Sequence, residues 1–501
     1  MAETSSLEKD VAKPLTDAKA VDAPKKKSFV SLFWDADYDT KSPLERSLVN
    51  KIDLGILIYA TLGYFVKTLD QQNINNAFLS GMREDLNMYG NELNYAVLAF
   101  NVPYCVLAIP SNILLTKIRP SLYLPIIELC WSILTIAKGF VHNYQTLYVL
   151  QFFIGAFEAG YFPGVVYLIG SWYTNSELSK RFAIFSVTSA IGAMFSGYLQ
   201  TAVYVGLNGS AGLSGWKWLF VVDGLISVVS AVVGFFLIPD FPETTKWKLF
   251  TPDEIELAKT RLNKDGKQGE VKYSWDLLKR VFGRWHWYLF TILYAIYNSA
   301  SSSWGYLGFL LKFGGGFTVE QINLYPTGVN AVTAFFTFFW GWYADHTQNR
   351  YLVIVLPMTI SAIFVTILAV WDVPFGLKFA SYFFAAVSTP ISNTMAYLST
   401  VVDKDPVERT LIIGSMNSAS YTIFIIGQLV FWPTTSAPSF PVGYKYTATS
   451  LWVGLIVVTA IRYLWKRDLA RGIIHTPEGT FVRKVSESKE DGELETEKIY
   501  T

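Results

Sequence analysis

Long apolar stretches alternate with short polar segments along most of the chain. Each stretch has about 20 residues, the length that an α-helix needs to cross the hydrocarbon core of a bilayer. The predicted spans are residues 53–75, 92–115, 120–139, 144–171, 181–205, 216–239, 286–311, 323–343, 351–371, 376–401, 410–432 and 447–466. Because a chain in lipid must satisfy its backbone hydrogen bonds internally, the pattern predicts an all-α membrane protein with twelve transmembrane helices.

One charged segment near the middle of the chain separates the spans into two sets of six. The predicted parts are a cytosolic tail over 1–50, a six-helix bundle over 51–239, a cytosolic linker over 240–285, a second six-helix bundle over 286–466 and a cytosolic tail over 467–501. Two such bundles are typical of transporters that hold the substrate at the midplane between their halves.

The segments outside the spans carry local signals of their own. Thr251-Pro252-Asp253-Glu254 places a capping side chain, a proline and two acids at successive positions, which predicts the start of a short helix in the linker. The first 50 residues and the region 470–501 are charged and poor in apolar residues. We therefore expect both tails to be mostly disordered.

Composition agrees with a membrane protein, since 51% of the residues are hydrophobic. The net charge of +1 gives no reason to expect a nucleic acid partner. The cations gather in alternate loops, with examples at Lys117, Arg119, Lys180, Arg181, Arg350, Lys404 and Arg409. The positive-inside rule therefore predicts that both termini are cytosolic.

The first span carries Lys67, Asp70 and Gln71, which share one helix face. A charge at membrane depth costs about 2.5 kcal/mol or more unless it meets a cavity or a partner. Lys67 is a candidate ligand for a substrate carboxylate, with Asp70 modulating it. The alternatives are an ion pair between Lys67 and Asp70 that neutralises itself, or a lysine that extends to the headgroups.

The fourth span contains a lone carboxylate at Glu158. Burial in an apolar span disfavours the charged form, so this group is a candidate for carrying a coupling proton. The alternative is a structural glutamate that supports helix packing beside Gly160 and Pro163, residues that permit close approach and a kink.

The seventh and tenth spans contribute further substrate-binding candidates. These are Asn298, Ser302 and Trp304 on the seventh span and Asn393 and Tyr397 on the tenth. Such side chains suit a polar organic molecule, although Ser and Thr also bond back to their own helix. Pro390 predicts a break in the tenth helix.

No enzymatic or metal chemistry is expected. The four histidines, His142, His286, His346 and His475, show no metal-ligand spacing. Nucleophile, phosphate-loop and nucleotide motifs are also missing from the sequence. We expect neither a cofactor nor an ATP-driven pump, and coupling to the proton gradient is the simplest interpretation.

Several motifs resemble those of known transporters. Gly341-Trp342-Tyr343-Ala344-Asp345, followed by Arg350, resembles the inter-helix motif of the major facilitator superfamily. Leu69-Asp70-Gln71-Gln72-Asn73-Ile74-Asn75-Asn76-Ala77, Ser80-Gly81-Met82-Arg83-Glu84-Asp85-Leu86 and Gly155-Ala156-Phe157-Glu158-Ala159-Gly160-Tyr161-Phe162-Pro163-Gly164 together resemble the fungal anion:cation symporter family. Within that family, the allantoate permease group, the similarity is greatest to the branch of pantothenate and biotin transporters.

The resemblance implies a monomeric, multi-pass protein of the plasma membrane that imports a small organic acid with protons, a vitamin such as pantothenate being the first candidate. It implies that Glu158 carries the proton. It also implies that Asp345 and Arg350 form a gate at the cytosolic ends of the helices, where Glu177 and Arg181 are further candidates for gate contacts.

The chain departs from the family at two positions. The family's Asp-Arg pair in the first span is Asp70-Gln71 here, and the arginine expected seven residues before Glu158 is Gln151. Lys67 is a candidate to replace these cations as a point charge. Other substrates remain open, namely biotin, allantoate, nicotinate, a dipeptide or a sulfonate, as does a nutrient receptor that does not transport.

Overall fold

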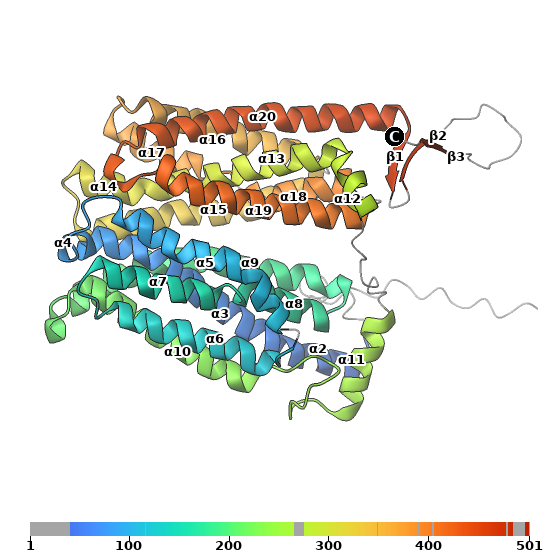
Figure 1. Ribbon diagram of the computed structural model, residues 1–501, viewed down its shortest axis with the longest axis horizontal. Coiled ribbons are helices and arrows are strands. Elements are labelled where there is room, and N and C mark those ends of the chain that lie inside the picture. The colour runs from blue at the N-terminus through green and yellow to red at the C-terminus, as the bar shows by residue number, and fades with distance from the viewer. Residues whose placement is uncertain are drawn as a thin grey trace, which may run out of the picture.

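The computed structural model describes residues 41–115, 117–264, 275–347, 349–388, 390–402, 405–476, 479–483 and 496–499. Two helical bundles lie side by side with their helices roughly parallel (Figure 1). The first contains α2 (Pro43–Ile52), η1 (Asp53–Leu57), α3 (Ile58–Ala77), η2 (Phe78–Met82), α4 (Arg83–Asp85), α5 (Glu92–Leu115), α6 (Pro120–Lys138), α7 (Tyr144–Glu158), α8 (Tyr161–Trp172), α9 (Asn175–Leu207), η3 (Ser210–Gly212) and α10 (Gly215–Leu237).

The second bundle follows two linker helices, α11 (Pro252–Lys264) and α12 (Trp275–Phe282). It contains α13 (Trp285–Ala300), η4 (Ser301–Tyr306), α14 (Leu307–Gly314), α15 (Val319–Thr347), α16 (Leu352–Val370), α17 (Phe375–Ala385), α18 (Pro390–Val401), α19 (Pro406–Val430), η5 (Thr434–Ser436) and α20 (Pro441–Ala470). A small sheet of β1 (Ile473–Thr476), β2 (Gly479–Arg483) and β3 (Thr496–Ile499) comes last.

The predicted spans correspond to these helices. In the described part of the chain, eight helices are long and apolar enough to cross a membrane by themselves. The remaining predicted spans correspond to α5, α15, and the interrupted helices α13–α14 and α17–α18. α5 and α15 are continuous helices that contain proline, whereas breaks interrupt α13–α14 and α17–α18.

Breaks occur at two positions that the sequence predicted. α7 ends at Glu158 and α8 begins at Tyr161. Gly160 lies so close to α5 that a Cβ atom there would meet the Ser111 Oγ at 1.8 Å, so a larger residue would have to displace the Ser111 side chain. The tenth span is broken before Pro390, as expected.

The predicted seventh span, 286–311, corresponds to α13 and α14 with a break between them. Residues Ser301–Tyr306 form a 3₁₀ turn between α13 and α14. The Ser301 hydroxyl donates to the Asn298 carbonyl at 2.6 Å, and such side-chain bonds compete with the helical backbone pattern.

The C-terminal tail is more ordered than expected. β1 pairs antiparallel with β2, with Ile473 opposite Val482 and Ile474 opposite Phe481, and β2 pairs with β3. These β-branched and aromatic residues favour strands even within a charged segment. In the N-terminal tail, Ser42 caps α2, so the end of the tail is helical from Pro43. Residues 1–40 lie outside the described residues.

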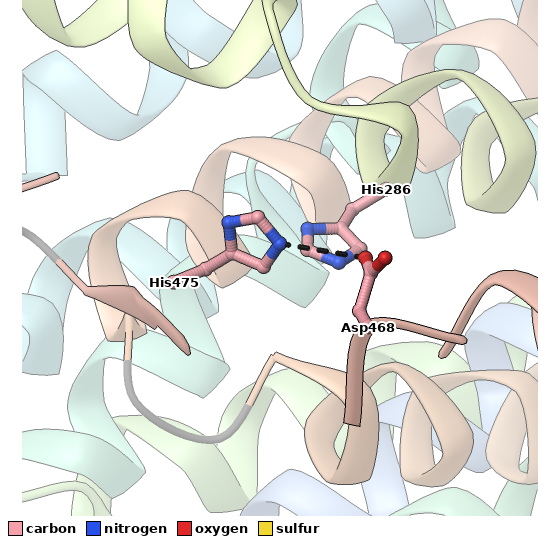
Figure 2. A group of neighbouring side chains, drawn as sticks. All are labelled: His286, Asp468 and His475. Carbon is pink, nitrogen blue, oxygen red and sulfur yellow. Dashed lines mark ion pairs between the residues drawn. The ribbon is translucent and has the colours of Figure 1, made fainter. Parts of the chain in front are cut away.

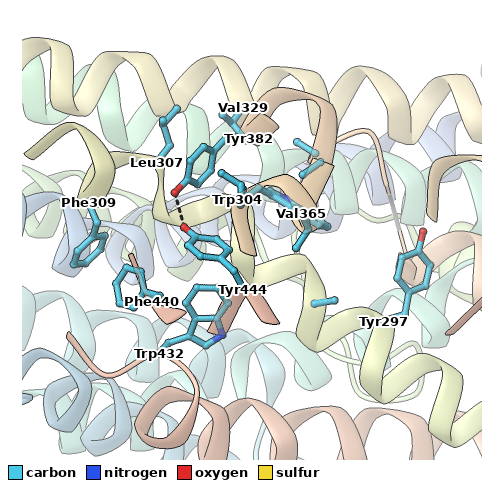
Figure 3. Packing of buried hydrophobic residues seen from close by; sticks show 14 of the residues in the cluster. Tyr297, Trp304, Leu307, Phe309, Val329, Val365, Tyr382, Trp432, Phe440 and Tyr444 are labelled. Carbon is cyan, nitrogen blue, oxygen red and sulfur yellow. Dashed lines mark hydrogen bonds between the residues drawn. The ribbon is translucent and has the colours of Figure 1, made fainter. Parts of the chain in front are cut away.

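The two ends of the molecule carry different elements. The terminal face carries α2, α11, α12 and β1, and the far face carries α4 and α14 at the opposite end (Figure 1). Between them, the second bundle has a core rich in aromatic residues. Figure 3 shows part of it, where the Tyr382 and Tyr444 hydroxyls hydrogen-bond near Trp432 and Phe440.

Candidate substrate and proton site

Glu158 ends α7 inside the first bundle and is fully buried. Its Oε2 accepts a hydrogen bond of 2.8 Å from Gln71 Nε2 and lies 3.6 Å from Lys67 Nζ. Lys67 and Gln71 lie one turn apart on α3, so the same helix face supplies both groups. The structure therefore brings together three of the residues that the sequence selected.

Lys67 also contacts two aromatic rings of the first bundle, and one of them lies beside a ring of the second bundle. Its Nζ lies 4.8 Å from the ring centroid of Tyr104 on α5 and 6.0 Å from that of Tyr64 on its own helix. The Tyr104 ring lies 6.2 Å from Tyr421 of α19 in the second bundle. The ammonium is thus near the interface between the bundles, where a ring face attracts a cation.

Asn298 lies on the second-bundle side of this interface. Its Nδ2 donates to Ser420 Oγ at 2.6 Å, which links α13 to α19 next to Tyr421. Sequence reasoning selected Asn298 but did not select Tyr104 or Tyr421. In an apolar span, the sequence does not distinguish a tyrosine of a binding site from a tyrosine that packs between helices or faces lipid.

Asp70 does not pair with Lys67. Its carboxylate accepts hydrogen bonds from Lys138 Nζ and, at 2.8 Å, from Thr135 Oγ1, both on α6. The predicted alternative of a Lys67–Asp70 ion pair is therefore wrong in this structure. Lys138 was not selected, because it follows the apolar part of its span and looks like an ordinary cation at a helix end.

The Asp70–Lys138 pair adjoins a second buried carboxylate. Asp223 of α10 accepts a 2.7 Å hydrogen bond from Asn73, whose side-chain oxygen accepts one from Ser196 at 2.6 Å. All five residues are buried. This network joins α3, α6, α9 and α10 and fixes the helix that carries Lys67.

The other predicted binding residues take separate positions. Gln151 is buried on α7, two turns before Glu158 and on the same face. Ser302 lines a small pocket with Ser299 and Gln428 inside the second bundle. Trp304 belongs to the aromatic core of that bundle (Figure 3).

Asn393 and Tyr397 pack within the second bundle. Asn393 Nδ2 donates to the Val353 carbonyl at 3.3 Å, and the Tyr397 ring contacts Phe290 and Trp465. The structure does not bring these two residues to Lys67 and Glu158. Their contacts are helix-to-helix contacts, so we do not include them in the site.

Two of the predicted gate residues belong to a cluster at the terminal face. Arg181 donates to both oxygens of Asp53, at 2.8 and 2.9 Å. Glu177 forms ion pairs with Lys41 and with Arg261 of α11. Burial by itself raises the pKa of Glu177, but Arg261 and Lys41 outweigh that effect and hold the pKa below its usual value. These contacts brace the first bundle against the linker.

The other two gate candidates lie at the end of the eighth span. Asp345 lies in the last turns of α15, and its side chain is outside what the structure describes. Arg350 follows in the short connection to α16. The motif is therefore positioned at the terminal face, as expected for the end of that span.

The far face is where side chains tie the bundles together. Asn94 of α5 donates to the Gln428 and Trp432 carbonyls at 2.6 and 2.8 Å and accepts from the Thr434 N–H at 2.7 Å. Asn323 of α15 donates to Ser80 at 2.8 Å. The Lys312–Glu84 ion pair at 3.1 Å and the 3.4 Å hydrogen bond from Asn330 to the Ala193 carbonyl also join the two bundles.

Comparison with known proteins decides the family. The Major Facilitator Superfamily model matches residues 60–428. The chain belongs to this superfamily. The two-bundle architecture and the superfamily membership together confirm the predicted fold. Superfamily membership also confirms a transporter role in place of an enzymatic one.

Proteins that are similar to this chain in sequence agree with the predicted branch of pantothenate and biotin transporters. The pantothenate transporter liz1 of Schizosaccharomyces pombe is 35% identical over 428 residues, covering 84% of this chain and 81% of liz1. The vitamin H transporter of Saccharomyces cerevisiae is 28% identical over 457 residues, covering 88% and 77% of the two chains. A bacterial homolog of the human lysosomal transporter Spinster has the same fold, with a TM-score of 0.60 at 14% identity over 85% of this chain and 98% of that one.

Proposed function

We propose that this superfamily transporter is a proton-coupled symporter that carries a small organic acid, pantothenate being the leading candidate, across the plasma membrane into the cell. The names of liz1 and of the vitamin H transporter support a vitamin substrate.

One observation carries the coupling proposal, namely that Glu158 and Lys67 lie 3.6 Å apart in a buried site. When Glu158 is ionised, its carboxylate neutralises the Lys67 ammonium. When Glu158 takes up a proton, Lys67 loses its counterion and can bind the carboxylate of a substrate in its place. Proton binding and anion binding therefore favour each other, which is the thermodynamic condition for symport.

Gln71 holds the Glu158 carboxyl group in position during this exchange. Its amide donates to the same Glu158 oxygen that faces Lys67, at 2.8 Å, so the carboxyl group is held in place in either protonation state. The second oxygen, Oε1, has no hydrogen-bond partner among the described residues. That oxygen is the position for the coupling proton, because a buried carboxylate oxygen without a donor is costly when charged.

The surroundings of Lys67 suit an organic acid that also has polar and apolar parts. The ammonium attracts a carboxylate as a point charge. Tyr104 and Tyr421 offer ring faces and hydroxyl groups, and Asn298 with Ser420 offers amide and hydroxyl groups from the opposite bundle. A substrate held between the bundles in this way would bias their relative position, as alternating access requires.

The contacts at the far face define the access state in this scheme. Asn94 and Asn323 hold the two bundles together there. On the proposed cytosolic position of both termini, the far face is the outer one, and these contacts support a state closed toward the outside. The substrate would leave toward the terminal face.

Uptake of labelled pantothenate tests the proposal in a yeast strain that lacks its own pantothenate permease. We expect uptake at pH 5 that falls at pH 7.5 and collapses when a protonophore is added. Competition by biotin, nicotinate, allantoate or a dipeptide would reassign the substrate while keeping the mechanism. Binding without accumulation would indicate a receptor and would contradict the proposal.

A further inference from the structure

Three side chains that are distant in the sequence converge at the terminal face of the second bundle. His286 lies in the first turn of α13, Asp468 in the last turns of α20, and His475 on β1. Each offers one nitrogen or oxygen atom, and these atoms lie within 4.8 Å of one another. Figure 2 shows the two imidazole rings and the carboxylate directed toward a common region.

The His286 ring is held in a defined orientation. It is buried, and its Nδ1 lies 2.9 Å from Glu408 Oε1. A neutral ring that donates its Nδ1–H to Glu408 keeps a lone pair on Nε2. A carboxylate behind a histidine is the common arrangement that orients a metal-ligating imidazole and increases its basicity.

Asp468 and His475 are also fixed in place. Trp285 Nε1 donates to Asp468 Oδ2 at 2.9 Å, and Arg467 donates to Oδ1. His475 Nε2 lies 3.6 Å from Asp468 Oδ2, longer than a hydrogen bond. Arg284 donates to the Thr476 carbonyl at 3.0 Å and so anchors β1 beside the cluster.

The charges around the cluster are compensated. Arg280 and Arg284 pair with Asp405, and Arg467 pairs with Asp468. Glu408 adds a further carboxylate that contacts both Arg284 and His286. The arginines are therefore matched by acids, and a bound cation would not face an uncompensated positive field.

We propose that His286, Asp468 and His475 bind a divalent transition-metal ion, with Zn²⁺ as the best match. Two imidazole nitrogens and one carboxylate oxygen are a recurring ligand set for zinc, with the fourth position left to water. The ion would fasten β1 to the first and last helices of the second bundle. This site is separate from Lys67 and Glu158 and does not depend on the proposed transport activity.

Metal binding to the full-length transporter tests the site directly. The protein would be purified through a tag without histidines, stripped with a chelator and titrated with Co²⁺ at pH 7.5. We expect one Co²⁺ per chain with a visible d–d band, displaced by Zn²⁺. Absence of a saturable band in the wild-type protein would overturn the proposal.

Matched variants locate the ion. His475→Ala should abolish the band, and it should leave the metal-free protein folded because His475 follows the last helix. His475→Cys should restore binding with a new thiolate-to-cobalt charge-transfer band. His346 is an exposed histidine at the same face, and the His346→Ala variant should bind Co²⁺ like the wild-type protein. A band that survives His475→Ala would place the ion elsewhere and would also overturn the proposal.

Discussion

The Lys67 ammonium faces the Glu158 carboxylate at 3.6 Å, while Gln71 donates to the same carboxylate oxygen at 2.8 Å. The pair joins α3 to α7 and is almost completely withdrawn from solvent. A charge that sits inside a protein must be matched by another charge or by a proton. In a transporter, a proton on Glu158 and a substrate anion beside Lys67 can therefore together replace this ion pair.

Replacing Lys67 should weaken substrate binding. A hydrogen bond to a charged group contributes about 1.5–3 kcal/mol, so we expect Lys67→Ala to raise the apparent dissociation constant roughly 10- to 150-fold. Lys67→Arg should retain part of the affinity, because it keeps the charge but changes its geometry. Saturation binding of the labelled substrate to membranes measures the effect.

Lys217 provides the control for this variant. It is another lysine of the first bundle, and it lies over Trp216 near the far face. Lys217→Ala should leave the affinity unchanged. Equal affinities for wild type and Lys67→Ala would show that Lys67 is not the substrate cation.

The Asp70–Lys138 pair should contribute to stability. Removing one partner leaves a buried charge uncompensated, which costs about 3–5 kcal/mol. We expect Lys138→Met to lower the thermal transition of the purified protein strongly, and the double variant Asp70→Leu/Lys138→Met to recover much of the loss. A double variant as unstable as the sum of the single variants would argue against a direct pair.

The closed far face depends on Asn94. Asn94→Ala leaves two carbonyls and one N–H without their side-chain partner, at a cost of about 1–3 kcal/mol per buried group. We expect the population to shift toward a state open at the far face. Pairs of spin labels across that face, measured by double electron–electron resonance, should show longer distances.

Asn91 is a matched control for Asn94, because both residues hydrogen-bond to the segment of the second bundle that contains Thr434 and Thr435. It bonds to Thr435 at 3.2 Å in a more exposed position. Because solvent can replace such a bond, Asn91→Ala should leave the distance distribution close to that of wild type. Identical distributions for Asn94→Ala and wild type would contradict the assignment of Asn94 to the closed state.

Glu177 should not contribute to the pH dependence of transport. Its pKa lies below the usual value of about 4.3, so its stabilising effect is complete above that pH and is lost as pH falls through the lower folded-state pKa. Glu177→Gln should reduce thermal stability at pH 7 and leave the uptake profile between pH 5 and pH 7.5 unchanged. A shifted uptake profile would show that this cluster titrates with transport.

Much of the architecture follows from the sequence because lipid imposes one simple requirement. Apolar helices of sufficient length are easily recognised, and Pro390 and Gly160 mark real helix breaks. The small sheet was missed because its strands are short and lie within a charged tail. Local composition there predicts disorder, while pairing between β1 and β2 overrides it.

The site was predictable only where a charge stood out against apolar neighbours. Glu158 and Lys67 were recognised on that basis, and their contact depends on how the first bundle places α3 and α7. Lys138 was not predicted to belong to the site because lysines at helix ends are common. Its pairing with Asp70 depends on the position of α6 relative to α3. The proximity of His286 to His475 likewise depends on tertiary structure, since their spacing along the chain carries no metal-ligand signal.

Reconstitution into proteoliposomes tests the central claim most directly, by comparing wild type with Glu158→Gln under an imposed pH gradient. Wild type should accumulate labelled substrate against its gradient. Glu158→Gln, which keeps the size of the side chain but cannot ionise, should exchange substrate in counterflow without gradient-driven accumulation. If Glu158→Gln still accumulates substrate in response to the pH gradient, Glu158 is not the coupling group and the account is wrong.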